Sequence, residues 1–216
     1  MGPAAEPLDC EGRTPIPGVP HRRTAPQTMP TAAPVSPESL VAGYLRAKDE
    51  NRPHLMPGVF ATDATLEMVV RTGTISFPPL SHGIDAITEV LVRGFGRTYE
   101  NVYTFCLQRP GAAASRFGCD WLVGMSEKAT GLPRVGCGRY DWTFGGGPSA
   151  RVERLMITIE TMQVLPAEAL DPVMAWVAAL PYPWCPPRVA VAAAPVVDGL
   201  EPVLRYVAAS RGDAPA

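Results

Sequence analysis

Four strand-like segments follow one another in the second half of the chain, and they restrict its fold more than any other feature. Each is rich in aromatic or β-branched residues, which favour strands, and they span residues 101–108, 116–125, 134–144 and 151–164. Glycine and proline mark the connections between them. Connections this short join antiparallel neighbours, so the sequence predicts an antiparallel meander.

A helix is predicted before these strands, starting at Pro37. Ser36 has the side chain of an N-cap, proline suits the first helical position, and Glu38 places an acid in the first turn. The stripe that follows at helical spacing consists of Leu40, Val41, Tyr44, Leu45 and, at its end, Lys48. The helix must end before Pro53.

Shorter elements complete the predicted fold. A second helix fits residues 54–60, and β-branched sequence predicts a strand at residues 65–70. Residues 74–77 suit a hairpin partner for that strand, and a third helix fits residues 83–94. The fold class is therefore α+β, with helices packed on a curved antiparallel sheet.

We expect three regions along the chain. Residues 1–35 have many prolines and no periodic apolar face, which predicts a disordered leader. The folded domain covers residues 36–185 and ends with an amphipathic helix at residues 166–180, suited to a lid or a dimer clasp. Residues 186–216 form an Ala/Pro-rich tail with a short helix within 196–209 and no residues that suggest chemistry.

Charge and cysteine usage argue against several classes of function. The net charge is −2 without a run of like charges, so we expect no nucleic-acid groove and no membrane-binding patch. The five cysteines lack metal-ligand spacing and are odd in number, which favours neither a metal site nor a disulfide framework, and no cofactor is predicted. Lacking a signal-peptide pattern and a membrane-spanning apolar run, the sequence predicts a cytoplasmic protein.

The passage from the first helix into the first strand resembles a known family. It reads Leu-Val-Ala-Gly-Tyr at residues 40–44 and Asp-Ala-Thr-Leu-Glu-Met at residues 63–68. This is similar to the opening of an NTF2-like domain, the superfamily of SnoaL-like proteins and ketosteroid isomerases. The resemblance extends over about residues 36–165 and implies a cone of helices on a curved sheet.

The resemblance implies roles for two tyrosines and removes the usual base. In ketosteroid isomerases the strand passage ends in the carboxylate that moves the proton, and here that position is Met68, whose thioether has no useful basicity. Tyr44 falls where the family places a phenolic donor to an oxyanion, and Tyr140 falls near the second donor. Tyr44 equally suits a core tyrosine on an amphipathic helix.

His82 and Glu67 are the residues near Met68 in the sequence that can accept a proton. His82 lies in the loop before the third helix, where a solvated or capping role is more common than a catalytic one. Glu67 alternates with Met68 along the strand and therefore faces away from it. The catalytic candidates are Tyr44, Tyr140 and His82.

Strand alternation sorts the remaining side chains between two faces. The inner face is largely apolar and suits a flat hydrophobic ligand, although aromatic residues at such positions also form ordinary cores. The predicted ligand-binding residues are Met68, Tyr103, Trp121, Trp142 and Ile157. The predicted outer face carries a cross-strand ladder of charges, made of Asp120, Arg139, Asp141, Arg154 and Glu160. We expect a homodimer through this convex face.

Two functions remain open from the sequence. The first is a small-molecule-binding protein with a hydrophobic pocket and no isomerase base. The second is an isomerase, dehydratase or cyclase that acts on a small hydrophobic carbonyl or phenolic substrate. Convergence of Tyr44, Tyr140 and His82 on one void would favour the enzyme, whereas a filled cone would favour a binding or assembly module.

Overall fold

The computed structural model of the chain describes residues 2, 35–147 and 149–210, so the predicted leader lies almost entirely outside the described residues. The first helix, α1 (Pro37–Asp49), starts and ends as predicted. Ser36 and Ser39 cap it reciprocally, each side-chain oxygen accepting a hydrogen bond from the backbone N–H of the other, at 3.0 and 3.1 Å. The cap fixes the start of the helix that carries Tyr44 and Lys48.

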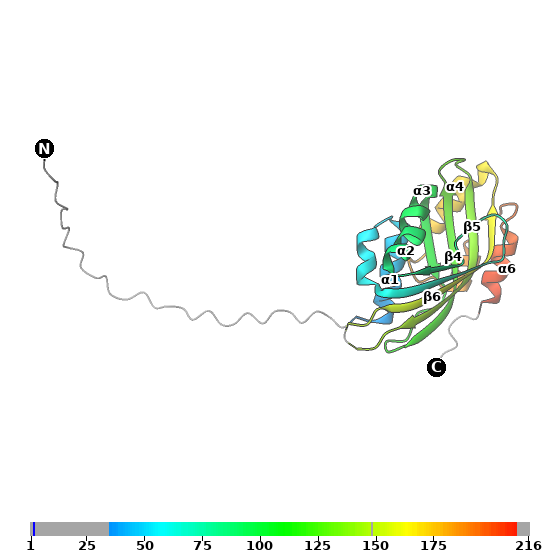
Figure 1. Cartoon of the computed structure of the whole chain (residues 1–216). Coiled ribbons are helices and arrows are strands. Elements are labelled where there is room, and N and C mark those ends of the chain that lie inside the picture. Colours follow the sequence, from blue (N-terminus) through cyan, green and yellow to red (C-terminus); the bar gives the residue numbers. More distant parts are fainter. Residues whose placement is uncertain (1, 3–34, 148, 211–216) are drawn as a thin grey trace, which may run out of the picture. The chain divides into compact units, whose positions relative to one another are not determined.

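Two further helical segments lie on the same side of the sheet as α1. A 3₁₀ helix, η1 (Pro53–Gly58), follows α1 where a second helix was predicted. The predicted third helix is longer than expected and has three parts, α2 (Ile84–Thr88), the π-helical η2 (Glu89–Gly94) and α3 (Phe95–Thr98). These segments and α1 cover one face of the sheet (Figure 1).

The sheet of the described residues has six strands in the order β2-β1-β6-β5-β4-β3. They are β1 (Phe60–Val70), β2 (Leu80–His82), β3 (Tyr99–Cys106), β4 (Arg116–Glu127), β5 (Pro133–Phe144) and β6 (Val152–Val164). The predicted meander from β3 to β6 is antiparallel throughout. However, β1 pairs with β6 in parallel, so the sheet is mixed. The predicted α+β class is confirmed.

The predicted hairpin partner at residues 74–77 is wrong. The strand that pairs with β1 is instead β2, in which His82 lies opposite Thr65. Thr74 is held by β5 and β6: the Arg134 guanidinium donates to its carbonyl oxygen at 2.7 Å, and its hydroxyl donates to the carbonyl oxygen of Met162. Thr74 therefore bonds to β5 and β6 rather than to β1, and the segment returns to β1 only at Pro79, whose carbonyl oxygen accepts from the backbone N–H of Met68 at 2.9 Å.

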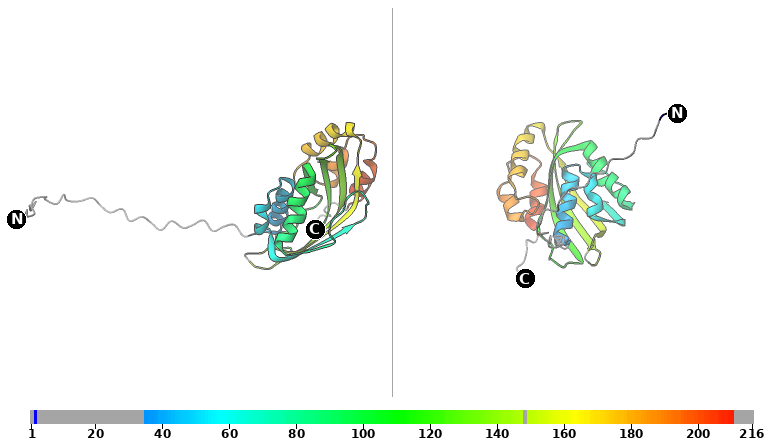
Figure 2. Two further views of the ribbon diagram at one scale, coloured as in Figure 1. Left: turned by 45° about the horizontal axis from the view of Figure 1, so that its top comes forward. Right: turned by 90° about the vertical axis from the view of Figure 1, so that its left-hand side faces the viewer.

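The C-terminal segment forms a second core on the opposite face of the sheet (Figure 2). Its helices are α4 (Leu170–Ala179), which follows the short 3₁₀ helix η3 (Ala167–Ala169), α5 (Pro187–Ala192) and α6 (Glu201–Ala209). They pack against apolar side chains of β3, β4 and β5. The close approach of α4 depends on Gly124, because a Cβ there would lie 2.7 Å from Val177. The segment predicted as a tail is thus partly docked on the sheet.

The predicted ladder of charges lies on this outer face, but not all of its members pair with one another. Arg139 lies 3.6 Å from Asp120 and 3.2 Å from Asp141. Arg154 pairs instead with Glu67 of the parallel strand β1, through two hydrogen bonds of 2.7 and 2.9 Å. Glu67 thus faces away from Met68, as predicted from alternation.

We expect the Glu67–Arg154 pair to stabilise the fold weakly and in a pH-dependent manner. Hydrogen bonds from Arg154 lower the pKa of Glu67 below its usual value of 4.5. Stability from this pair is therefore present above pH 4.5 and is lost as the pH falls through the folded-state pKa. Glu67→Gln should lower the melting temperature slightly at pH 7, because both side chains are substantially exposed. The difference from the unsubstituted protein should shrink at pH 3.5.

Glu100→Gln serves as the control for this pH series, since the described residues offer the exposed Glu100 carboxylate no ion pair. A Glu67→Gln difference that is equally large at pH 7 and pH 3.5 would contradict the assignment.

Candidate functional site

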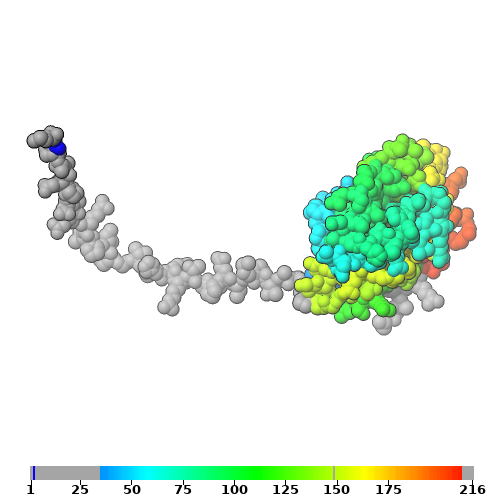
Figure 3. Space-filling view, in the orientation of Figure 1, coloured from blue at the N-terminus to red at the C-terminus, as the bar shows by residue number. Residues whose placement is uncertain are grey.

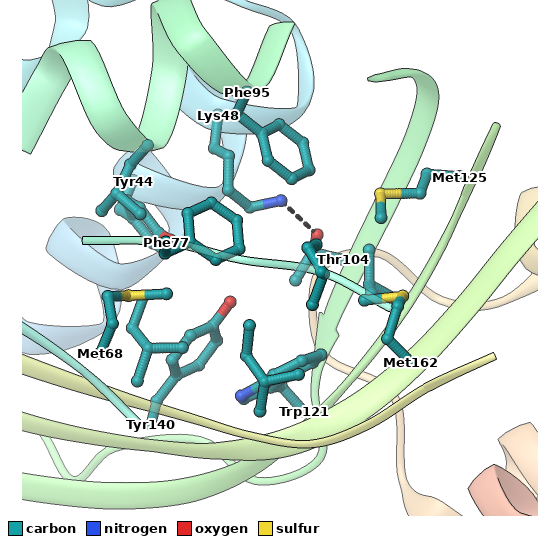
Figure 4. Close-up of a pocket in the computed structure, with 15 residues that line it drawn as sticks. Tyr44, Lys48, Met68, Phe77, Phe95, Thr104, Trp121, Met125, Tyr140 and Met162 are labelled. Carbon is teal, nitrogen blue, oxygen red and sulfur yellow. Dashed lines mark hydrogen bonds between the residues drawn. The ribbon is translucent and has the colours of Figure 1, made fainter. Parts of the chain in front are cut away.

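A cavity of about 50 Å³ lies between α1, the η2–α3 segment and the concave face of the sheet. Figure 4 shows the side chains that line it, which come from both layers. Most of the wall is apolar, and three of its members are the flexible methionines Met68, Met125 and Met162. Thioether side chains adapt readily to the shape of a bound molecule. The wall thus suits a compact apolar group.

Tyr44 and Tyr140 contact each other in the wall of this cavity. Both side chains are fully buried, and their rings meet edge to face with centroids 6.0 Å apart. The Tyr44 hydroxyl makes no hydrogen bond of full geometry among the described residues, although a looser hydrogen-bonding approach to the Tyr140 hydroxyl lowers its pKa. Burial outweighs this effect and raises the pKa of both phenols far above the usual range. Both therefore act as neutral hydrogen-bonding groups.

Lys48 supplies the cavity's polar end. It is the one charged side chain that lines the cavity among the residues the structure describes, and it is 6% exposed. Its Nζ lies 2.6 Å from Oδ1 of Asp49 and 2.7 Å from Oγ1 of Thr104. Figure 4 shows the Lys48 amine and the Tyr140 hydroxyl directed toward the same space between helix and sheet.

Three side chains separate the cavity from the outside. Ile75, Phe77 and Phe95 line both the cavity and an outer hollow of about 370 Å³. In the space-filling view, the segment between β1 and β2 lies beside the helical segment from α2 to α3 on the surface that faces the viewer (Figure 3). We call Ile75, Phe77 and Phe95 the partition. A benzene-sized ligand occupies a cavity of about 150 Å³, so such a ligand can bind only if a side chain of the partition moves.

The structure brings together five of the residues proposed from the sequence. They all line the cavity, and they are Tyr44, Met68, Trp121, Tyr140 and Ile157. The indole N–H of Trp121 is buried and has no hydrogen-bond partner among the described residues, like the Tyr44 hydroxyl. The cavity thus holds two buried polar groups without partners.

Three other proposed residues do not line the cavity. Trp142 lies behind it, packed against Tyr44 with ring centroids 5.3 Å apart. Tyr103 packs against the second core on the other face of the sheet. His82 is exposed on β2, where its Nδ1 lies 3.3 Å from Oγ1 of Thr65. The structure therefore does not bring His82 together with the two tyrosines.

Sequence reasoning missed the group formed by Lys48, Asp49 and Thr104. The available signal was the position of Lys48, which follows Tyr44 by one helical turn on the apolar stripe. A lysine on a buried helix face needs a partner. The partner Thr104 lies 56 positions further along the chain, so the sequence did not reveal it.

The described residues provide no cluster of three or more His, Cys, Asp or Glu side chains that could hold a metal ion. Within the same part of the chain, no helix has the length and apolar character needed to cross a membrane.

No protein-family model and no curated protein sequence matches the chain. Among solved structures, an NTF2-like superfamily protein from Salmonella enterica serovar Typhimurium is 15% identical, with a TM-score of 0.49 over 57% of this chain and 88% of that one. A ketosteroid isomerase-like protein from Erwinia carotovora atroseptica is 16% identical, with a TM-score of 0.43 over 57% and 93%. An NTF2-like protein from Burkholderia xenovorans is 14% identical, with a TM-score of 0.43 over 66% and 99%.

The architecture agrees with the resemblance seen in the sequence. Helical segments come first, a long curved sheet follows, and the cavity lies on the concave side, with Tyr44 on the helix side and Tyr140 on the sheet. The order of its elements and its α+β class are those that the resemblance to NTF2-like domains predicts.

Proposed function

We propose that the protein binds a small, mainly apolar molecule in this cavity. The observation that carries the proposal is the Tyr44 hydroxyl, which is buried in an apolar wall and has no hydrogen-bond partner among the described residues. A buried polar group left unpaired costs about 1–3 kcal/mol. A ligand with a hydrogen-bonding group removes this cost, so the free cavity is suited to being filled.

The replacement of the isomerase base by Met68 supports binding rather than proton transfer. Met68 lies in the cavity wall, and a thioether cannot abstract a proton. An isomerase, dehydratase or cyclase that acts on a small carbonyl or phenolic substrate is the second candidate. It is favoured by the two phenols, which suit stabilisation of an oxyanion. His82 is exposed on β2 and is not among the residues that line the cavity, so binding is the preferred function.

Homodimerisation through the outer face of the sheet stays a prediction. The helices α4 and α6 contact β3, β4 and β5 there, so a partner copy has only the uncovered part of this face, around Arg154 and Met156. The cytoplasmic location also stays a prediction.

Tyr44→Phe tests the binding function through two effects of opposite sign. The substitution removes an unpaired buried hydroxyl, so the free protein should be at least as stable as the unsubstituted one. Loss of one hydrogen bond to the ligand should weaken binding by about 3- to 10-fold. Thermal-shift titration with small cyclic ketones and phenols measures both effects.

Tyr206→Phe is the matched control for this titration. It removes a tyrosine hydroxyl that donates to Asp120 at 2.9 Å on the opposite face of the sheet, so it should leave ligand affinity unchanged. The binding function is wrong if no compound stabilises either the unsubstituted protein or a Phe77→Ala variant, in which the partition is reduced.

A further inference from the structure

Lys48 is held in one position by a hydrogen-bonded network that is buried except at Tyr182. Asp49 accepts hydrogen bonds from the backbone N–H and the hydroxyl of Thr104, both at 2.8 Å. It also accepts from the Tyr182 hydroxyl at 3.2 Å, which comes from the loop after α4. The Asp49 side chain is only 3% exposed. With its oxygens engaged, this carboxylate is not available to the cavity, but it fixes the ammonium at the cavity's end.

The ammonium retains capacity for one more acceptor. Two of its three donors are directed to Asp49 and Thr104. In the remaining space the Nζ lies 4.6 Å from the ring centroid of Phe95, one of the three partition side chains. An aromatic face is a weaker acceptor than an oxygen atom. A ligand oxygen can therefore take the place of this contact.

The cavity has more donors than acceptors. Besides Lys48, its wall includes Trp121 and Tyr44, whose indole N–H and hydroxyl are buried without a hydrogen bond of full geometry among the described residues. A ligand that complements such a wall brings an acceptor and needs no donor of its own. A hydrocarbon would leave these groups unpaired, and a site built for hydrogen bonding discriminates strongly against a ligand that lacks the matching group.

The negative charge of Asp49 makes a neutral acceptor on the ligand more favourable than an anionic one. A ligand carboxylate would share one ammonium with Asp49, whose Oδ1 is already 2.6 Å from Nζ. It would also lose its hydration in an apolar cavity, which strongly disfavours a charged group. An uncharged carbonyl oxygen accepts the hydrogen bond with neither penalty.

We propose that Lys48 is the specificity-determining residue of this cavity, and that it selects apolar molecules ending in an uncharged carbonyl oxygen. The proposal rests on the binding function proposed above and names the ligand class. Asp49, Thr104 and Tyr182 are positioning residues, which act on the ligand through Lys48.

A pair of isosteric probes tests this selection. Cyclohexanone and methylenecyclohexane differ in C=O against C=CH₂, and their dissociation constants are measured by following the indole N–H signal of Trp121 in NMR titrations. We expect the ratio of the two constants, hydrocarbon over ketone, to fall about tenfold in Lys48→Met, because a hydrogen bond from a charged donor contributes about 1.5–3 kcal/mol. The double variant Lys48→Met/Asp49→Asn, which leaves no unpaired charge, should show the same fall.

The matched control is Lys128→Met, which replaces the other lysine of the chain. Its Nζ donates to the carbonyl oxygen of Gly96, and it does not line the cavity, so the ratio should be unchanged. The same measurements are repeated in Phe77→Ala, in which the smaller side chain lets the probes enter without movement of the partition. Selection by Lys48 is overturned if both probes bind and the ratio in both Lys48 variants equals the ratio in the unsubstituted protein.

Two further outcomes separate the proposals from each other. If neither probe binds the unsubstituted protein or Phe77→Ala, the binding function itself fails, and the selection by Lys48 fails with it. If cyclohexanecarboxylate binds more tightly than cyclohexanone and loses this advantage in Lys48→Met, the ligand class is anionic and the assignment to uncharged carbonyls is overturned.

Discussion

Trp142→Ala is expected to lower the free energy of unfolding by about 3–5 kcal/mol, the range for truncating a large buried aromatic side chain. Trp142 is 2% exposed. Its ring packs against Tyr44 at 5.3 Å and stacks on Phe144 at 6.2 Å between centroids. The alanine would leave a cavity between helix and sheet that these aromatic rings fill only in part. Urea denaturation monitored by circular dichroism measures the loss.

Trp142→Phe distinguishes lost packing from lost hydrogen bonding. The Trp142 indole N–H has no hydrogen-bond partner among the described residues, so its removal should cost nothing by itself. The phenylalanine variant should therefore retain more than half of the stability that the alanine variant loses. A loss below about 1.5 kcal/mol in Trp142→Ala would contradict the packing described for this residue.

Asp49→Asn is expected to lower the free energy of unfolding by about 3 kcal/mol, because it leaves a buried ammonium without its counter-ion. The asparagine can still accept from the backbone N–H of Thr104, so the substitution mainly removes charge. Removing the second charge as well should relieve this cost. We therefore expect Lys48→Met/Asp49→Asn to be more stable than Asp49→Asn alone.

A thermodynamic cycle of the two single variants and the double variant measures this coupling. If the stability loss of the double variant equals the sum of the losses of the two single variants, Lys48 and Asp49 do not interact in the folded protein. Arg46→Met/Glu50→Gln is the surface control, because that pair is exposed and joined by one contact of 3.3 Å. Its coupling should be below about 1 kcal/mol.

Local signals predicted most of the fold. The N-cap at Ser36 and the proline after it fixed the start of α1, and the glycine and proline connections separated the strands of the meander. Period-two alternation placed Tyr140 on the inner face and Arg139 on the outer one. These features depend on neighbours in sequence, which is why they could be predicted.

Features that depend on distant pairing could not be predicted in this way. The parallel pairing of β1 with β6 joins strands separated by most of the domain, and nothing in either strand specifies its direction. The docking of α6 depends on apolar surface supplied by β4 and β5. At the cavity, Tyr44 and Met68 followed from the resemblance, whereas the contact of Lys48 with Thr104 required the fold to bring β3 beside α1.

The helices on the outer face have a consequence for how the protein can adapt to different molecules. Along β4, Trp121 and Val123 face the cavity, while Leu122 between them is buried in the second core. Any outward shift of this strand would disturb both cores at once, and close-packed interiors resist such shifts. The sheet is thus the rigid side of the cavity. Changes in the volume of the cavity must come from the helical side, where Phe77 and Phe95 lie between the cavity and the outer hollow.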